Sequence, residues 1–408
     1  MAGEERIVGL DIGTTKIATI IAEMDDSERP RIIGIGTSPS EGLKRGVVIN
    51  LEKTVESIAS AVEDAEMVAG VKVDSVFCGI AGDHIRSINS RGVIAVSRSD
   101  HEITSTDVEK VIEAAKTVAL PMDREIIHVL PQEFTVDDQS GIKDPVGMVG
   151  VRLETEVHIV TGAVTAAQNI YRSVKKAGLE IQDLVLQPLA SSYALLSPDE
   201  EELGVALIDL GGGTTDFAIF FDGSIRHTGV VGLGGKNVTN DIAIGLRTPV
   251  DQAEEIKKVY GSALSSLVAS DEMIEVPAVG GGEPKQISRN VLASIIEPRL
   301  EEILSLTMQE MKKSNYFDLL ATGIVLTGGG SLMEGVAELT EKIFDVPVRV
   351  GKSQGINGLD ERATSPIYAT GVGLILYGWE QMREGKSGGR LKGKGWFQKM
   401  KNILSQYL

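Results

Sequence analysis

A short phrase occurs twice in this chain, at widely separated positions. The first copy is Val8-Gly-Leu-Asp11-Ile-Gly13-Thr14-Thr15-Lys16, and the second is Leu207-Ile-Asp209-Leu-Gly211-Gly212-Gly213-Thr214-Thr215. Each copy has an apolar run, an Asp, a tip of Gly and Thr, and a second apolar run, which predicts a β-hairpin. A tip without bulky side chains lets phosphate oxygens approach backbone N–H groups, and the neighbouring carboxylate can hold Mg²⁺ through its waters. The repeat therefore predicts two related halves that clamp one polyphosphate.

A single hairpin of this kind would be ordinary turn chemistry, because Gly and Asp are common in tight turns. Two copies with the same order of Asp, Gly and Thr indicate a duplicated architecture instead. A third segment points the same way, since the apolar run Ile324-Val-Leu-Thr327 is followed by Gly328, Gly329, Gly330 and Ser331 and then by a helical pattern. We expect this backbone to pass close to a purine, with the helix N-terminus facing bound anion.

Together these segments resemble the ATPase superfamily of actin, sugar kinases and heat-shock chaperones, over about residues 6 to 380. The resemblance implies an α/β, ribonuclease-H-like fold in which two duplicated lobes close on ATP. It also implies that Asp11–Lys16 and Asp209–Thr215 are the phosphate loops, with Asp11 and Asp209 as the metal-binding residues. Many members place another residue at the position of Lys16, and strand alternation leaves the direction of its side chain open.

The same resemblance implies further roles outside the two loops. Gln187 stands where actin-like members place the residue that orients the attacking water, and Asp209 would assist through the water shell of the metal. Gly234 and Gly235, followed by Asp241, correspond to contacts with ribose and adenine, as do Glu254 and Lys257. For the last pair, a solvent-exposed ion pair at i,i+3 is an alternative.

Composition excludes several other classes of protein. A net charge of −18 over 408 residues argues against nucleic acid as a partner, because neutralising phosphates needs a basic face. The single cysteine, Cys78, excludes a disulfide framework, and the five histidines show no metal-ligand spacing. No N-terminal signal sequence and no apolar run of membrane-spanning length is present in the sequence. The length predicts two or three domains.

Apolar periodicity predicts the order of the elements. Short strands are expected at 7–10, 17–22 and 32–37, a helix at 51–69 that Gly70 ends, and a strand at 75–80. An insertion follows, with strands at 93–96, 126–130, 132–136 and 157–160 and a helix introduced by a capping box of Thr104 and Asp107. A β-hairpin is expected at 274–279 and 285–287. The predicted domains are a first lobe at 1–83 and 163–202, an inserted small subdomain at 84–162, a second lobe at 203–239 and 316–384, and a second small subdomain at 240–315.

The end of the chain differs in character from the rest. Residues 385–394 have the composition of a flexible linker, and from residue 385 onward there are six basic residues and no acidic one. Residues 395–408 predict an amphipathic helix, too short to span a bilayer, that would lie in the headgroup plane of anionic lipid. Its apolar stripe comprises Trp396, Phe397, Met400, Ile403, Leu404, Tyr407 and Leu408, and Lys399 and Lys401 flank it. A helix that docks on its own domain or in a partner's groove is the alternative.

An actin-like ATPase with a rearranged insertion and a membrane-binding tail resembles the FtsA family of bacterial cell-division proteins. The resemblance covers essentially the whole chain. It implies that ATP supports polymerisation into filaments on the cytoplasmic face of the membrane at the septum, with at most slow hydrolysis. It further implies that the filaments tether the FtsZ ring, whose C-terminal peptide the second small subdomain receives, and recruit later division proteins. Actin-like pilus-assembly ATPases and, less favoured, a small-molecule kinase are the competing interpretations.

Overall fold

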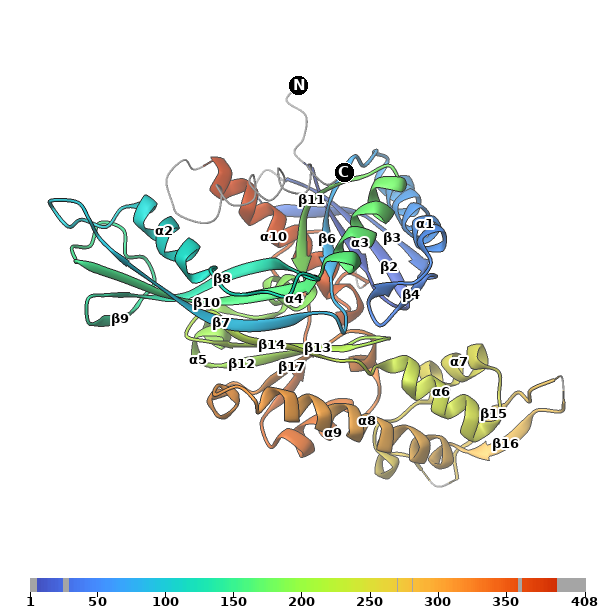
Figure 1. Ribbon diagram of the computed structural model, residues 1–408. Coiled ribbons are helices and arrows are strands. Elements are labelled where there is room, and N and C mark those ends of the chain that lie inside the picture. The colour runs from blue at the N-terminus through green and yellow to red at the C-terminus, as the bar shows by residue number, and fades with distance from the viewer. Residues whose placement is uncertain (1–5, 25–28, 270, 281, 359–361, 387–408) are drawn as a thin grey trace.

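The computed structural model describes residues 6–24, 29–269, 271–280, 282–358 and 362–386. It has an α/β architecture with a five-stranded sheet in each of two lobes and a four-stranded sheet in an inserted subdomain. Figure 1 shows the first lobe above the second, with the inserted subdomain and the second small subdomain extending to opposite sides.

The sheet of the first lobe has the strand order β11-β6-β1-β2-β3. β1, β2 and β3 are antiparallel neighbours, whereas β6 runs parallel to β1 and β11 runs parallel to β6. The expected strands at 7–10, 17–22, 32–37 and 75–80 are all present. The bounds are β1 Arg6–Ile12, β2 Lys16–Met24, β3 Pro30–Pro39, β6 Ser75–Ile80 and β11 Glu180–Leu186, with a short pair formed by β4 Leu43–Lys44 and β5 Val47–Val48.

The helix α1, Leu51–Ala69, has the bounds that its apolar periodicity predicts. The side chain of Asn50 caps its start by accepting a hydrogen bond from the backbone N–H of Lys53. Gly70 ends it in the left-handed conformation, at φ 68°, which a residue without a side chain adopts at little cost. The other helices of this part of the chain are α3 Val164–Lys176, α4 Gln187–Leu195 and α5 Pro198–Leu203.

The second lobe repeats the arrangement of the first. β12 pairs antiparallel with β13 and parallel with β17, as β1 pairs with β2 and β6, and the strand order is β14-β13-β12-β17-β18. The bounds are β12 Val205–Leu210, β13 Thr215–Phe221, β14 Ser224–Val231, β17 Ile324–Thr327 and β18 Val348–Val350. The second small subdomain contains α6 Gly235–Leu246, α7 Val250–Tyr260, η1 Ser265–Leu267, β15 Met273–Val276, β16 Lys285–Ser288 and α8 Arg289–Met311. β15 and β16 form the predicted hairpin.

The inserted subdomain has its own sheet, in the order β7-β10-β8-β9. The predicted capping box of Thr104 and Asp107 introduces its helix. Two expected strands, 126–130 and 132–136, are one strand that runs through Pro131, because a register shift beside this residue accommodates the missing N–H. The bounds are β7 Arg86–Ala95, α2 Ser105–Ala115, β8 Arg124–Val136, β9 Gln139–Ile142 and β10 Arg152–Ala163. β9 was not predicted, since its four residues lack apolar alternation.

The inserted subdomain lies across β14 of the second lobe, which is an edge strand (Figure 1). Ser87 Oγ donates to the carbonyl of Thr228 at 2.9 Å, and Gln132 Nε2 donates to the carbonyl of Ile225 at 2.9 Å. These side chains pair backbone groups that an edge strand leaves without a strand partner.

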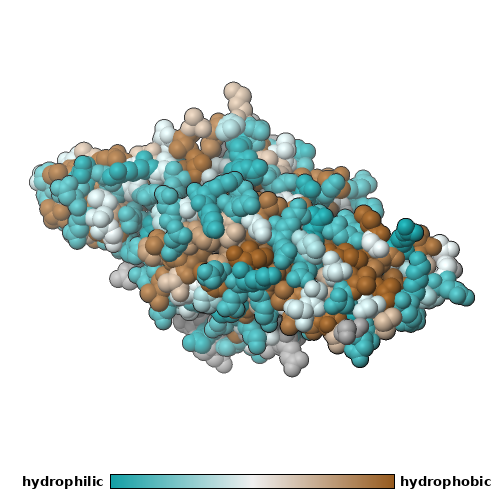
Figure 2. All heavy atoms as spheres, turned by 90° about the horizontal axis from the view of Figure 1, so that it is seen from below, coloured by the Kyte–Doolittle hydropathy of each residue, from teal (hydrophilic) through white to brown (hydrophobic). Residues whose placement is uncertain are grey.

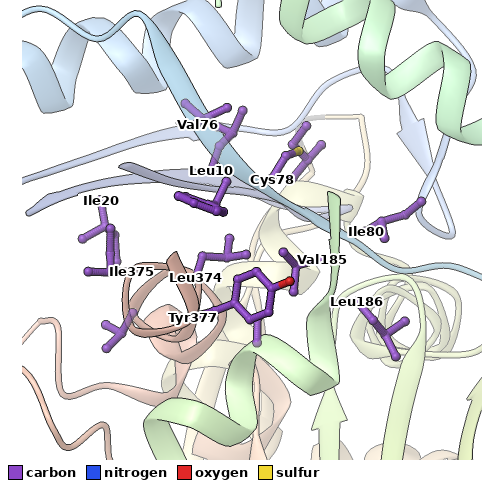
Figure 3. Close-up of a cluster of buried hydrophobic side chains, with 14 of the residues drawn as sticks. Leu10, Ile20, Val76, Cys78, Ile80, Val185, Leu186, Leu374, Ile375 and Tyr377 are labelled. Atoms are coloured by element: carbon purple, nitrogen blue, oxygen red, sulfur yellow. The ribbon is translucent and has the colours of Figure 1, made fainter. Parts of the chain in front are cut away.

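The helix α10, Ala369–Lys386, packs on the first lobe and not on the second, where the expected range 316–384 placed it. Figure 3 shows Leu374, Ile375 and Tyr377 of this helix beside Leu10, Ile20, Val76, Cys78 and Val185 of the first sheet. An apolar pattern shows that a helix is buried but not which sheet covers it, and this is why the assignment was wrong. The remaining elements are η2 Phe317–Leu319, η3 Gly329–Leu332, α9 Val336–Phe344 and η4 Pro366–Tyr368.

Within residues 6–386, no described helix is long and apolar enough to cross a membrane. The amphipathic helix predicted at 395–408 lies outside the described residues.

Candidate functional site

The tips of the two repeated hairpins lie against each other across the lobes. We call residues 11–16 loop I and residues 209–215 loop II. A Cβ atom added to Gly212 would lie 2.3 Å from Cγ2 of Thr15, and one added to Gly213 would lie 2.7 Å from Cγ2 of Thr14. Both distances are far below van der Waals contact, so glycine is required in loop II as long as the threonines of loop I keep these positions.

Asp11, Lys16 and Asp209 interact electrostatically although they come from different lobes. Burial raises the pKa of Asp11 to about 6, and Lys16 opposes this shift. Burial, followed by the charges of Asp216 and Asp11, raises the pKa of Asp209 to about 8. Burial lowers the pKa of Lys16 to about 8, and both aspartates oppose this shift. Buried carboxylates with raised pKa values form an environment that favours an additional cation.

Gln187 is placed beside Asp11 in the first lobe. It is the first residue of α4, directly after β11, and its Nε2 donates to Oδ1 of Asp11 at 2.8 Å. Gly79 leaves room for it, because a Cβ atom there would lie 3.1 Å from Cγ of Gln187. The carboxylate thus orients the amide group of Gln187.

Gly234 and Gly235 hold loop II from the side of the second small subdomain. Gly235 N donates to the carbonyl of Gly211 at 2.9 Å, and the next residue, Lys236, donates from its N to the carbonyl of Gly212 at 2.8 Å. The Nζ of Lys236 reaches across to the first lobe and donates to the carbonyl of Thr14 at 2.9 Å. We did not predict a role for Lys236, although its place directly after the two glycines was a usable signal.

Glu254 and Lys257 lie next to these glycines and do not form a simple solvent-exposed pair. Lys257 Nζ donates to Glu254 Oε2 at 2.7 Å, to Thr239 Oγ1 at 2.9 Å and to the carbonyl of Gly235 at 3.2 Å. Burial lowers the pKa of Lys257, and Glu254 opposes this shift. The pair therefore joins α7 to the beginning of α6.

The third glycine segment also reaches loop II. Gly328 follows β17 at φ 80°, and a Cβ atom added to it would lie 2.2 Å from Oδ1 of Asp209. Ser331 Oγ donates back to the carbonyl of Gly328 at 2.7 Å. The expected helix does not begin here, because Gly329 and Gly330 belong to the 3₁₀ turn η3.

The α-helix after this turn, α9, begins only at Val336, after Gly335 at φ 77°. The prediction that a helix N-terminus faces the site from this segment is therefore wrong. The left-handed glycine inserts a turn between the strand and the helix, which the apolar pattern does not reveal.

Two acidic residues have surroundings that we did not predict. Asp216 was not predicted as part of the site, yet it is buried, accepts a hydrogen bond from Thr214 Oγ1 at 2.6 Å, and influences Asp209. Asp241, expected near the ribose, forms an ion pair with Arg299 of α8, whose Nε lies 2.5 Å from Oδ2. A ribose contact by Asp241 would have to compete with this ion pair.

The donor set fits a magnesium–polyphosphate complex better than a bare metal ion. No group of three or more His, Cys, Asp or Glu side chains within the described ranges is arranged to hold a metal. Two carboxylates are nevertheless a suitable set for Mg²⁺, which usually takes its other ligands from phosphate and water. Lys16, Lys236 and Lys257 bring positive charge to the loops, in a chain whose net charge is −18. This combination suits a multiply charged anion with a bound cation.

Comparison with known proteins identifies the family. The family model described as "Cell division protein FtsA" matches residues 206–373, and the one described as "SHS2 domain inserted in FTSA" matches residues 82–161. The cell division protein FtsA of Pseudomonas aeruginosa is 50% identical over 381 residues, which cover 93% of this chain and 91% of that protein. This chain belongs to the FtsA family.

Other FtsA proteins are similar over nearly the same length. The protein of Escherichia coli K12 is 41% identical over 388 residues, covering 93% of this chain and 92% of its own length. The protein of Bacillus subtilis 168 is 42% identical over 383 residues, covering 94% and 86%. This chain is thus a member of a family of cell-division proteins. Its inserted four-stranded subdomain is the SHS2 domain of that family.

Solved structures show that the fold is actin-like, as the family resemblance implied. MreB5 of Spiroplasma citri bound to ADP superimposes with a TM-score of 0.57 at 14% identity, covering 94% of this chain and 99% of that one. A PilM–PilN type IV pilus biogenesis complex gives a TM-score of 0.66 at 16% identity, covering 91% and 98%.

Proposed function

We propose that this FtsA-family protein binds ATP and Mg²⁺ between its lobes and polymerises on the cytoplasmic face of the membrane at the division septum. There it would tether the FtsZ ring and recruit later division proteins. The observation that carries the nucleotide part of this proposal is the meeting of loop I and loop II around Asp11, Lys16 and Asp209. Related lobes that bring complementary loops together are suited to hold one ligand between them.

The roles proposed for the residues follow from where the chain places them. The glycine and threonine tips would cradle the phosphates, with Lys16 providing charge, and Asp11 and Asp209 would hold Mg²⁺ through its waters. The metal would neutralise phosphate charge. Gln187, oriented by Asp11, would align the attacking water. The segments proposed to face ribose and adenine are Gly234 and Gly235, Glu254 and Lys257, and Gly328, Gly329, Gly330 and Ser331.

A surface for a partner peptide is proposed on the second small subdomain. Large hydrophobic side chains are exposed there, and Figure 2 shows brown atoms gathered at the end of the molecule that carries this subdomain. Apolar side chains that are exposed together on one face are typical of protein-binding surfaces. They support the proposal that the C-terminal peptide of FtsZ docks here. The exposed residues are Ile244, Val250, Val259, Tyr260, Leu267, Met273, Val279 and Val291.

Membrane attachment is assigned to residues 395–408. Ile403 and the aromatic residues Trp396 and Tyr407 would enter the headgroup region, while Lys399 and Lys401 would contact anionic lipid. A pilus-assembly ATPase is the second candidate because the folds are similar, but its relationship at 16% identity is far weaker than the 50% identity to FtsA.

Co-sedimentation with anionic vesicles and electron microscopy on an anionic lipid monolayer test this proposal. With Mg·ATP we expect the full chain to sediment with the vesicles and to form filaments on the monolayer. Removing residues 387–408 spares α10 and should abolish sedimentation, as should Trp396→Glu on the apolar face. Asn402→Glu adds the same charge on the polar face and is the matched control that should still bind. Unchanged sedimentation of the truncated chain would refute membrane attachment by the tail, and a lack of filaments would refute polymerisation.

A further inference from the structure

Lys16 contacts the turn from which α10 begins. Its Nζ donates to the carbonyl of Ile367 at 3.1 Å and lies 3.7 Å from the centroid of the Tyr368 ring. A cation over an aromatic ring is attracted by the electron density of its face. Both contacts are made with η4, Pro366–Tyr368, which directly precedes the first residue of α10. The last residue of loop I thus binds a segment far away in the sequence.

The turn η4 lies where both lobes meet. From the second lobe, Thr327 Oγ1 at the end of β17 donates to the carbonyl of Pro366 at 3.2 Å. From the first lobe, Lys16 holds the next two residues. One residue further into α10, the hydroxyl groups of Thr370 and Ser191 are hydrogen-bonded at 3.0 Å, and Ser191 belongs to α4, the helix that Gln187 begins. Groups at the candidate site therefore surround the start of α10.

The first turns of α10 are tightly packed against α4 and β1. A Cβ atom added to Gly373 would lie 1.8 Å from the carbonyl oxygen of Ala190 in α4. One added to Gly9 in β1 would lie 2.7 Å from the carbonyl oxygen of Gly371. Close-packed elements transmit displacement instead of absorbing it. A shift of η4 should therefore move the whole of α10 against β1 and α4.

We propose that Lys16 couples occupancy of the site to the position of α10. The proposal rests on the nucleotide function proposed above, since it needs an anion between the loops. The ammonium group of Lys16 binds a neutral carbonyl and a ring in this structure, and a polyphosphate offers it charged oxygens, which make stronger hydrogen bonds. On binding, Lys16 turns to the phosphate and releases Ile367 and Tyr368, so that η4 and α10 adopt a new position.

A shift of α10 on nucleotide binding would affect the segment that follows this helix. The chain continues from α10 directly into residues 387–408, which include residues 395–408, the segment proposed to attach to the membrane. A change in the position of α10 would alter where that segment begins. Nucleotide binding would thereby regulate how the tail is presented, without any contact between the nucleotide and the tail.

Trp379 is a reporter of the position of α10. The chain has two tryptophans, so Trp396→Phe leaves Trp379 as the only one. Its indole is partly buried against the first lobe, with the guanidinium carbon of Arg383 at 4.7 Å from the ring centroid. In this background we expect Mg·ATP to change the acrylamide quenching constant of Trp379 by about twofold, as the ring leaves its packed environment.

Tyr368→Leu in the same background separates coupling from binding. It removes the ring that Lys16 faces but leaves Lys16 and both loops in place. We expect ATP affinity, measured independently by equilibrium dialysis, to stay within about threefold, while most of the Trp379 response is lost. Tyr316→Leu, which removes a ring that the guanidinium of Arg226 faces at 5.7 Å in the second lobe, is the matched control and should keep both affinity and response.

Each outcome bears on the proposal. Binding of ATP without any change at Trp379, or a full response in Tyr368→Leu, would overturn the coupling while leaving the nucleotide function intact. Failure of the dialysis experiment to detect ATP would overturn the nucleotide function, and the coupling with it. Hydrogen exchange of the unsubstituted chain is the second measurement, in case Tyr368→Leu does not fold. The amides of 367–370 should exchange faster with Mg·ATP, and equal or slower exchange would contradict the release of η4.

Discussion

Loop I and loop II have similar sequences and turns of the same length, but they play different parts. Ile12 pairs with Ile17 and Leu210 pairs with Thr215, so residues 13–16 and 211–214 form equivalent turns. In this register the threonines Thr14 and Thr15 correspond to Gly212 and Gly213, and these are the residues that touch across the lobes. The duplication accounts for two similar tips. They fit each other because loop I has threonine side chains where loop II has only the hydrogen atoms of glycine.

The charges of the two loops differ in the same complementary way. A sequence alignment of the two repeated segments would pair Lys16 with Asp216. In the structure, however, Lys16 occupies the hairpin position that corresponds to Thr214. Asp216 lies opposite Asp209 on the neighbouring strand. Loop I thus contributes the cation, and Asp216, the residue directly after loop II, contributes an extra carboxylate. Burial is the largest cause of both shifts, and the charges of Asp216 and Asp11 raise the pKa of Asp209 further, to about 8, compared with about 6 for Asp11. Loop II depends more on a counter-charge than loop I does.

The largest effect is expected from removing the carboxylate with the most strongly raised pKa. Asp209→Ala should weaken Mg·ATP binding by about 100-fold, because the carboxylate proposed to hold Mg²⁺ through its waters is lost. Isothermal titration calorimetry would measure it, with circular dichroism to show that the chain stays folded. Asp241→Ala, which removes a carboxylate paired with Arg299, is the matched control and should bind within a few fold of the unsubstituted chain. Equal affinity of Asp209→Ala would remove this residue from the site.

A smaller effect is expected from breaking the fit of the tips. Gly212→Ala places a methyl group 2.3 Å from Cγ2 of Thr15, and overpacking of about 2 kcal/mol corresponds to about 30-fold weaker ATP binding. Thr15→Ala removes Cγ2 and Oγ1, so the double variant should recover most of the loss if the contact is direct. A double-mutant cycle of dissociation constants measures the coupling. Additive losses would show that the tips do not act as a pair when ATP is bound.

The smallest effect is expected from pH. Metal binding requires ionised Asp209, whose pKa of about 8 means that it must release a proton below this pH, and affinity should fall by up to about tenfold per unit. Above pH 8, Lys16 loses its proton because its pKa is lowered to about 8, and the attraction for phosphate weakens. Affinity for Mg·ATP, followed by calorimetry from about pH 7 to about pH 9, should therefore peak near pH 8. Asp209→Asn should remove the acidic side of this peak, and an unchanged profile would contradict the assignment.

Local patterns predicted much of the fold because they act over short distances. The spacing of apolar residues and Gly70 were sufficient for α1, and the capping box of Thr104 and Asp107 was sufficient for the start of α2. The insertion required more, because the strand through Pro131 exists only where a bulge beside it absorbs the missing donor. The sheet on which α10 packs could not be predicted, since its apolar residues would suit either lobe.

The sequence alone determined that the chain has two hairpins of one design, each with an aspartate beside a glycine and threonine tip. Turn chemistry and strand alternation are properties of neighbouring residues, so they can be recognised without the rest of the molecule. Only the tertiary structure decided that Thr15 meets Gly212, that Lys236 crosses between the lobes, and that Lys16 holds the turn before α10. These contacts join residues far apart in the chain, and the packing of whole lobes sets their distances.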